Sequence, residues 1–386
     1  MRVAFYAPLK PPTHPVPSGD RRMARLLMAA LARANHRVDL ASRFRSREGS
    51  GDPMRQTALA ATGRHVAQRL AEQYRRLPAA ERPEVWFTYH LYYKAPDWLG
   101  PAVADALDIP YVVAEASHAG KRANGPWSIG HAATAAALAR ADAVINLNPA
   151  DMPGVRSAAG ASTLIVMLKP FIDGADFAAA ANRRDPFRAD LARRFGLDAT
   201  VPWLLAVAMM RDGDKLASYR TLADALGELG DLGWQLLAVG DGPARAAVEA
   251  ALSVLGRGRV HYAGARPLEE LPAFYAAADL LVWPAINEAY GMSLLEAQAA
   301  GMPIVAGAAG GVPSIVAADR TGLLTPPGNP GAFAAAVRTL LADPARRRAM
   351  GDTAKEMIAE EHDIAAAARV LDQALRDAVN RHKRLG

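Results

Sequence analysis

Two glutamates eight positions apart carry the strongest chemical signal in the chain. Glu288 follows residues 280–284, an apolar run typical of a buried strand, and Glu296 lies in a run of good helix formers that Gly291 opens. A helix N-terminus offers free backbone N–H groups and a partial positive charge, which suit a phosphate. Carboxylates near it are placed to accept hydrogen bonds from sugar hydroxyls. The alternative is an ordinary helix with acidic residues in its early turns.

Strands and helices alternate along both halves of the 386-residue chain. Apolar residues at helical spacing, such as Met23, Leu27 and Leu31, separate the strand-like runs. This alternation predicts parallel sheets covered by helices on both faces, which bind ligands at the carboxyl ends of their strands. The strands are expected at residues 3–7, 38–41, 85–89, 111–114 and 143–147, and then at 203–208, 235–239, 260–263, 280–283 and 303–306.

The length exceeds that of one ordinary domain, so two are expected. Residues 1–170 predict an N-terminal Rossmann-like domain and residues 171–362 a second one. Residues 363–386 predict a helix that packs back on the first domain. Between the strands of the first half and those of the second half, residues 177–201 are expected to form a short helix and a connector.

The sequence Glu-Ala-Tyr-Gly-Met-x3-Glu-Ala-x-Ala-x-Gly-Met-Pro-Ile-Val at residues 288–305 resembles the signature of retaining glycosyltransferases of the GT4 kind, also called glycosyl transferases group 1. The match covers about residues 168–342, and the first half resembles the family more loosely. It includes residues 169–177 as a variant of the interdomain segment, 239–243 and 260–264 as strands with their turns, and 310–313 and 321–324 as loops after the signature helix.

The resemblance implies the α/β fold called GT-B, in which two doubly wound domains face each other across a cleft. It implies a nucleotide-diphosphate sugar as donor, bound by the C-terminal domain. In this family the residue at Glu296 contacts the ribose and the one at Glu288 contacts hydroxyls of the transferred sugar. The backbone of Tyr290, Gly291 and Met292 would meet that sugar and the distal phosphate.

Positive charge at the leaving diphosphate is the largest catalytic lever for such a transfer, because negative charge develops there in the transition state. The family supplies an Arg and a Lys after the first strand of the C-terminal domain. Lys215 matches the Lys, whereas Met209 stands at the Arg position. Arg211, two residues further on, is the candidate substitute in donor binding.

The N-terminal half contributes fewer candidates. Gly19, in a loop that resembles the family's first strand-to-helix connection, is expected to offer its backbone N–H to the diphosphate. His118 occupies a position where the family often has a His near the reacting centre, and His90 is a second acceptor-side candidate. Glu288, Lys215 and His118 are therefore the expected catalytic residues. We name no catalytic base, and we expect neither a metal nor a cofactor, since no Asp-x-Asp motif occurs in a suitable context.

Composition narrows the possible classes of protein. The chain has no cysteine, which excludes disulfides, thiolate metal sites and a Cys nucleophile. No apolar run is long enough to span a membrane, no signal peptide is evident, and a cytoplasmic protein is expected. Residues 1–82 hold 15 Arg and one Lys against six Asp or Glu, a local balance of +10. This excess suits an anionic membrane face or a phosphorylated acceptor, and the alternative is a solvated surface.

The expected activity is hexosyl transfer to a glycan, lipid-linked or small-molecule acceptor, in cell-surface polysaccharide or glycolipid synthesis. A nucleotide-sugar epimerase or a phosphorylase on the same fold is the first alternative. A nucleotide-sugar-binding protein that has lost catalysis is the second, and Met209 is the feature that supports it. A dehydrogenase is disfavoured because no strand precedes Gly-x-Gly-x-x-Gly, and only charge would argue for nucleic-acid binding. The base, the sugar and the acceptor stay open.

Overall fold

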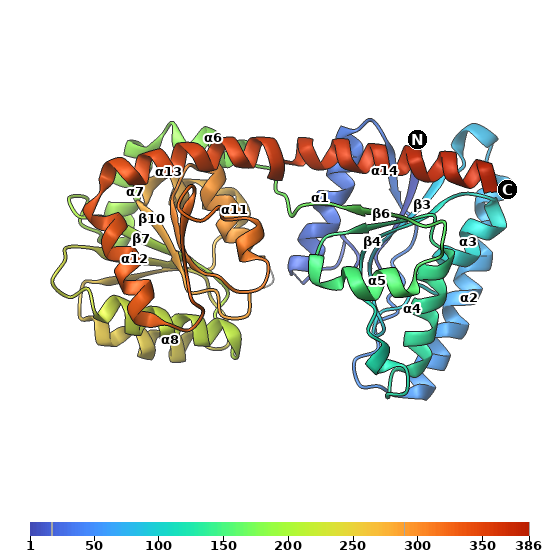
Figure 1. The fold of residues 1–386 in the computed structure, drawn as a ribbon, viewed down its shortest axis with the longest axis horizontal. Coiled ribbons are helices and arrows are strands. Elements are labelled where there is room, and N and C mark those ends of the chain that lie inside the picture. Colours follow the sequence, from blue (N-terminus) through green and yellow to red (C-terminus); the bar gives the residue numbers. More distant parts are fainter. Residues whose placement is uncertain (17, 289, 386) are drawn as a thin grey trace. The chain divides into compact units, whose positions relative to one another are not determined.

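The computed structural model describes residues 1–16, 18–288 and 290–385, which form two compact units. The first unit contains Met1–Lys169 and Ile364–Gly386, and the second contains Pro170–Asp363. Each unit has a six-stranded sheet with helices packed around it (Figure 1). The predicted α/β class is confirmed. No helix in the described part of the chain is both long and apolar enough to cross a bilayer.

All neighbouring strands of the first sheet are parallel. Its central strands are continuous buried apolar runs because helices cover both faces. In spatial order the strands are β2 (Arg37–Leu40), β1 (Arg2–Tyr6), β3 (Val85–Leu91), β4 (Tyr111–Ala116), β5 (Ala143–Asn146) and β6 (Leu164–Met167). The helices of this unit are α1 (Gly19–Arg33), α2 (Pro53–Arg76), α3 (Gly100–Leu107), α4 (Ser128–Arg140), α5 (Met152–Ala158) and α14 (Ile364–Leu385).

The second sheet repeats the same construction with parallel pairings throughout. Its strands, in spatial order, are β12 (Gly322–Thr325), β11 (Ile304–Gly307), β10 (Leu280–Trp283), β7 (Trp203–Val207), β8 (Gln235–Val239) and β9 (Val260–Gly264). Its helices are α6 (Ala175–Ala181), α7 (Arg184–Phe195), α8 (Asp214–Gly227), α9 (Arg245–Leu252), α10 (Leu271–Ala277), α11 (Met292–Ala299), α12 (Pro330–Ala342) and α13 (Pro344–Met357).

Three expectations from the sequence were wrong in detail. The edge strand β6 was missed, and β12 forms where residues 321–324 were expected to be a loop. Both strands have four residues and are only half-buried at several positions. The sequence of β12, Gly-Leu-Leu-Thr, lacks the apolar run of a central strand, whereas β6, Leu-Ile-Val-Met, has an apolar run too short to distinguish a strand by its periodicity. The segment 177–201, expected as one short helix and a connector, instead contains most of α6 and all of α7.

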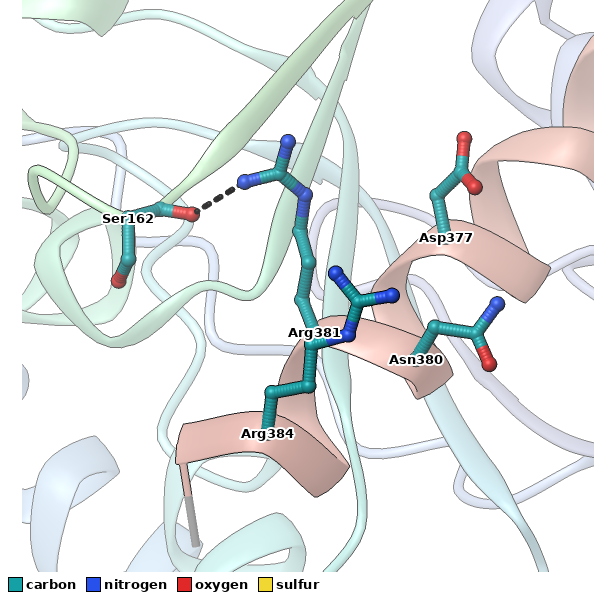
Figure 2. Close-up of a pocket in the computed structure, with 5 residues that line it drawn as sticks. All are labelled: Ser162, Asp377, Asn380, Arg381 and Arg384. Carbon is teal, nitrogen blue, oxygen red and sulfur yellow. Dashed lines mark hydrogen bonds between the residues drawn. The ribbon is translucent and has the colours of Figure 1, made fainter.

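Helix α14 runs to Leu385 and packs on the first unit. Its apolar face, which includes Leu371 and Leu375, is buried. The His382 ring lies 3.1 Å from an Asp142 carboxylate oxygen, and the Arg381 guanidinium donates to the Ser162 carbonyl (3.3 Å). Figure 2 shows this second contact at the edge of a shallow pocket that is also lined by Asp377, Asn380 and Arg384.

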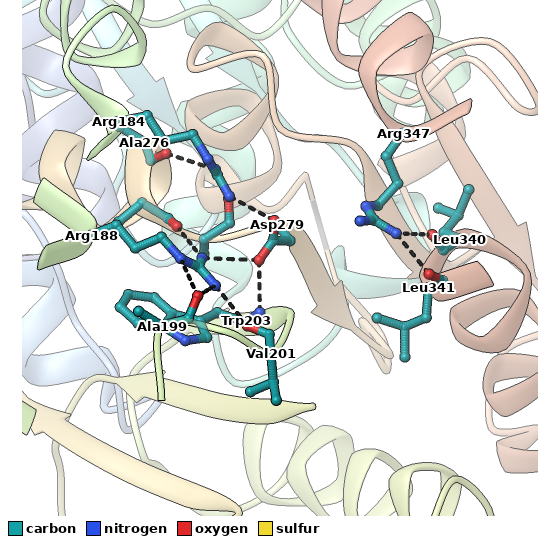
Figure 3. Close-up of polar contacts among 12 residues, drawn as sticks. Arg184, Arg188, Ala199, Val201, Trp203, Ala276, Asp279, Leu340, Leu341 and Arg347 are labelled. Atoms are coloured by element: carbon teal, nitrogen blue, oxygen red, sulfur yellow. Dashed lines mark hydrogen bonds and ion pairs between the residues drawn. The ribbon is translucent and has the colours of Figure 1, made fainter. Parts of the chain in front are cut away.

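Two arginines on α7 hold this helix against the rest of the second unit (Figure 3). The Arg188 guanidinium donates to the carbonyls of Ala277 and Val201 and to the Asp279 carboxylate, and it lies 4.1 Å from the Trp203 ring centre. Arg184 donates to Asp279 and to carbonyls at the end of α10. The last carbonyls of a helix have no partner within it, so these guanidinium groups cap α10.

We predict that Arg188→Ala lowers the free energy of unfolding of the full chain by about 2–4 kcal/mol, because it takes one donor from the half-buried Asp279 carboxylate and removes the guanidinium donor from the carbonyls of Ala277 and Val201. Chemical denaturation monitored by tryptophan fluorescence would measure this. The control is Arg193→Ala on the same helix, whose 73% exposed side chain pairs with Asp190 and should cost less than about 0.5 kcal/mol. Equal losses in the two variants would contradict the capping role of Arg188.

Candidate active site

The loop that follows β10 has a constrained backbone. Ala285, Asn287 and Gly291 have φ values of 54°, 50° and 76°, a region that non-glycine residues rarely adopt. Side chains of α8 hold the loop, since the Ile286 N–H donates to the Ser218 hydroxyl (3.0 Å) and the Asn287 amide donates to the Asp214 carboxylate (3.0 Å). Strained backbone of this kind persists where surrounding contacts determine it, and it is frequent at ligand sites. Ala289 of the signature lies outside the described residues.

Glu288 and Lys215, predicted from distant parts of the sequence, meet at this loop. The Lys215 ammonium donates to a Glu288 carboxylate oxygen, which also accepts from the Trp283 indole N–H (3.1 Å). The ammonium lies 5.4 Å from the centre of the Trp283 ring. Lys215 is the second residue of α8, where the helix dipole disfavours a cation. The carboxylate offsets this disadvantage, and a bound anion would do the same.

Helix α11 begins directly after Gly291, and no side chain caps its N-terminus within the described residues. Residues 294–299 of this helix are buried, and Glu296 among them is 2% exposed. The Tyr275 hydroxyl donates to one carboxylate oxygen of Glu296 (2.6 Å). Tyr275, from α10, was not predicted, because nothing in its apolar sequence context distinguishes it from a core residue. Tyr290 and Met292, the other predicted donor contacts, are half-buried beside the start of α11.

Glycines after β8 serve packing of the second unit. A Cβ at Gly240 would lie 1.9 Å from the Ala208 carbonyl oxygen, and one at Gly242 would lie 2.3 Å from that of Met210. These glycines let the loops after β7 and β8 run against each other at one edge of the sheet. Met209 is 43% exposed there. The exposed Arg211 side chain makes no hydrogen bond or ion pair within the part of the chain described, so it does not join the pair of Lys215 and Glu288.

In the first unit, His90 lies between two carboxylates that we did not predict. Its Nδ1 is 3.2 Å from an Asp20 oxygen and 3.9 Å from a Glu115 oxygen. Both His90 (φ 65°) and Glu115 (φ 56°) have left-handed backbone conformations at the ends of their strands. A polar residue at the carboxyl end of a buried strand was the available signal for Glu115, and proximity to Gly19 was the signal for Asp20.

Charges in this cluster depend on one another. Burial opposes protonation of His90, but the hydrogen bond to Asp20 and the charge of Glu115 outweigh it and raise the pKa of His90. The same hydrogen bond lowers the pKa of Asp20. Burial raises the pKa of Glu115. The three groups can therefore hold or move a proton next to a ligand hydroxyl.

His118 lies against a second imidazole. Its ring centre is 4.6 Å from that of His131, a buried residue of α4. Burial and then the neighbouring His131 lower the pKa of His118, which favours its neutral form. Gly19 is the first residue of α1, and a Cβ there would have open space around it. Across the described residues, no three His, Asp or Glu side chains gather closely enough to hold a metal ion.

Comparison with known proteins identifies the family. The sequence profile described as "Glycosyl transferases group 1" matches residues 215–357. The chain is 31% identical to the 2-deoxystreptamine glucosyltransferase of Streptomyces kanamyceticus over 282 residues, which cover 70% of this chain and 71% of that protein. It is 41% identical to the D-inositol 3-phosphate glycosyltransferase of Corynebacterium glutamicum, but over only 31% of this chain and 29% of that protein.

Solved structures share the fold of the whole chain. A glycosyltransferase from Rickettsia africae has a TM-score of 0.74 and 13% identity, covering 97% of this chain and 98% of that one. The HepE protein of Anabaena, solved in complex with UDP-glucose, has a TM-score of 0.68 and 19% identity, covering 97% and 99%. Together, the fold and the sequence matches show that this chain belongs to the glycosyl transferases group 1 family and has the GT-B fold.

Proposed function

We propose that this glycosyltransferase transfers a sugar from a nucleotide-diphosphate sugar to an acceptor with retention of anomeric configuration, as the GT4 type does. Its role would be hexosyl transfer in cell-surface polysaccharide or glycolipid synthesis, in the cytoplasm. The observation that carries the proposal is the contact between Lys215 and Glu288, beside the N-terminus of α11. A cation, a carboxylate and a helix N-terminus at one place match a diphosphate joined to a sugar.

Donor binding would exchange partners within this site. The donor's phosphates would draw the Lys215 ammonium away from Glu288 and leave that carboxylate to accept hydrogen bonds from the sugar. Glu296 would hold the ribose from the buried side of α11. The UDP-glucose complex of the Anabaena protein supports a donor of this class for the present fold.

Charge stabilisation would then drive the transfer. Negative charge grows on the diphosphate as its bond to the anomeric carbon breaks, and a preorganised ammonium next to a helix N-terminus stabilises it. We propose that Lys215, with Arg211 as a further cation, supplies this charge without a metal.

Acceptor binding is assigned to the first unit. The cluster of His90, Asp20 and Glu115 lies at the carboxyl edge of its sheet and presents both donors and acceptors to a hydroxyl group. His118, whose pKa is lowered by burial and by the neighbouring His131, is a further hydrogen-bonding group on the same edge.

A nucleotide panel tests the donor assignment. We predict that one of UDP, GDP or ADP, at one hundred times its Kd, stabilises the chain by about 2.7 kcal/mol, measured as a shift in Tm. Nucleotide binding without hydrolysis or transfer of any nucleotide sugar would favour the non-catalytic alternative, for which Met209 argues. No Tm shift with any of the nucleotides would contradict the donor site.

Separate substitutions should divide the roles of the two glutamates. Glu296→Ala should weaken nucleotide binding about tenfold or more, because it removes the acceptor for the ribose hydroxyls. Glu288→Ala should lower kcat with a smaller effect on nucleotide Kd. Isothermal titration and initial rates measure the two quantities, with Glu356→Ala, at an exposed position of α13, as the control. Similar small effects in all three variants would refute the assignment.

Removing the Asp20 carboxylate should lower the pKa of His90. We predict that Asp20→Asn shifts the His90 titration to lower pH, measurable by NMR, and shifts the matching limb of the pH–rate profile in the same direction. A histidine whose pKa is raised on folding stabilises the folded state at pH values below its pKa in the unfolded chain. This contribution is lost as the pH rises through its pKa in the folded protein. The variant should therefore lose stability mainly on the acid side. Asp39→Asn, an exposed carboxylate paired with Arg37, should change neither quantity.

A further inference from the structure

Residues 41–49, which follow β2, form a segment outside the sheet without regular secondary structure. Exposed and buried residues alternate along its second half. Arg43, Arg45 and Arg47 are exposed, while Ser46 and Glu48 are buried. The segment thus displays three arginines to solvent.

The loops after β1 and β3 hold this segment in place. The Ser46 N–H donates to the Pro8 carbonyl (3.1 Å) and its hydroxyl to the Pro96 carbonyl (2.6 Å). The Glu48 N–H donates to the Lys94 carbonyl (2.8 Å). Pro8 follows β1, and Lys94 and Pro96 follow β3, so the segment is fixed at the carboxyl edge of the sheet.

The one carboxylate within the segment is engaged locally. Glu48 accepts hydrogen bonds from the N–H groups of Ser50 (2.9 Å), Gly51 (2.5 Å) and Asp52 (3.2 Å), as well as from the Ser50 hydroxyl. It is 5% exposed and faces away from the arginines' side of the segment. The Glu48 carboxylate therefore stabilises this turn and does not pair with the arginines.

Two further cations lie beside the segment on aromatic rings. The Lys94 ammonium is 4.4 Å from the Trp127 ring centre, and the Arg122 guanidinium is 5.4 Å from that of Tyr93. The Trp127 indole N–H donates to the Glu48 carbonyl (3.0 Å), which ties these rings to the segment. We call Arg43, Arg45, Arg47, Lys94 and Arg122 the basic edge.

No member of the basic edge forms an ion pair with a carboxylate among residues 1–16, 18–288 and 290–385. Arg45 instead contacts the Leu9 carbonyl (3.1 Å) and the His14 ring (3.5 Å). Arginines elsewhere in the same unit, such as Arg140, do pair with acids. Cations that share one edge of a sheet without a carboxylate partner repel one another, and a bound anion would relieve that repulsion.

We propose that the basic edge binds a phosphate group carried by the acceptor, so that the acceptor is a phosphorylated sugar or cyclitol. Guanidinium groups fit phosphate oxygens in pairs, and the half-buried Tyr93 and Trp127 rings offer apolar faces to the ring that carries the phosphate. Lys94 and both rings are half-buried and not protruding, which suits a small ligand better than a membrane surface. The inference rests on the proposed function, because it specifies the acceptor of that reaction.

The test compares each phosphorylated probe with its unphosphorylated parent on the full chain. Titration calorimetry should detect binding of glucose 6-phosphate or inositol 3-phosphate but no binding of glucose or inositol. Affinity should fall with rising salt. A variant with Arg43→Gln, Arg45→Gln and Arg47→Gln should lose at least tenfold in phosphate affinity. The matched control carries Arg64→Gln, Arg69→Gln and Arg76→Gln on α2, which removes the same charge from exposed positions and should leave affinity unchanged.

Three outcomes would overturn the proposal. The first is that no phosphorylated probe binds, and the second is an equal loss of affinity in the two triple variants. The third is binding to phosphatidylglycerol vesicles that needs the basic edge while both sugar phosphates fail to bind, which would assign the edge to a membrane. Nucleotide binding in the same variants separates this result from failure of the proposed function, because Lys215, Glu288 and Glu296 belong to the second unit and should be unaffected.

Discussion

Parallel pairing of the strands within each described sheet is the constraint on which the remaining structure depends. A parallel sheet has to be covered on both faces, which explains why β1, β3 and β10 are buried almost completely and why helices alternate with them. Parallel pairing also collects the loops after neighbouring strands at a single edge. Glu288, Lys215 and His90 each lie in such a loop, at the end of a strand or at the start of the helix that follows.

In the second unit this arrangement places a cation where a helix alone would not favour one. Lys215 occupies the first turn of α8, and the dipole of that helix opposes its charge. The Glu288 carboxylate, from a loop more than seventy residues later, compensates for this cost. An ion pair of this kind can be opened by an anionic ligand, because the ligand replaces the lost partner of the lysine while the freed carboxylate finds hydroxyl donors.

The first unit divides its edge into two electrostatic environments. Around His90 two carboxylates surround one imidazole, and the backbone at His90 and Glu115 is held in a left-handed conformation. Along the basic edge five cations have no carboxylate partner among the described residues. A ligand that carries hydroxyl groups at one end and an anionic group at the other would satisfy both environments. Such a ligand would explain why the two environments share one edge of the sheet.

Local sequence was sufficient for the parts of the protein that depend on local pattern. The central strands, the helical stripes and the strand, loop and helix around Glu288 and Glu296 follow from apolar periodicity and glycine placement, because burial dictates those patterns. The edge strand β12 escaped prediction because its partly exposed sequence lacks an apolar run, and β6 escaped it because its apolar run of four residues is too short to show a period. Tertiary structure alone decided which side chains meet. The pairing of Lys215 with Glu288, of Tyr275 with Glu296 and of His90 with Asp20 joins residues on different elements, and only the spatial order of parallel strands brings such elements together.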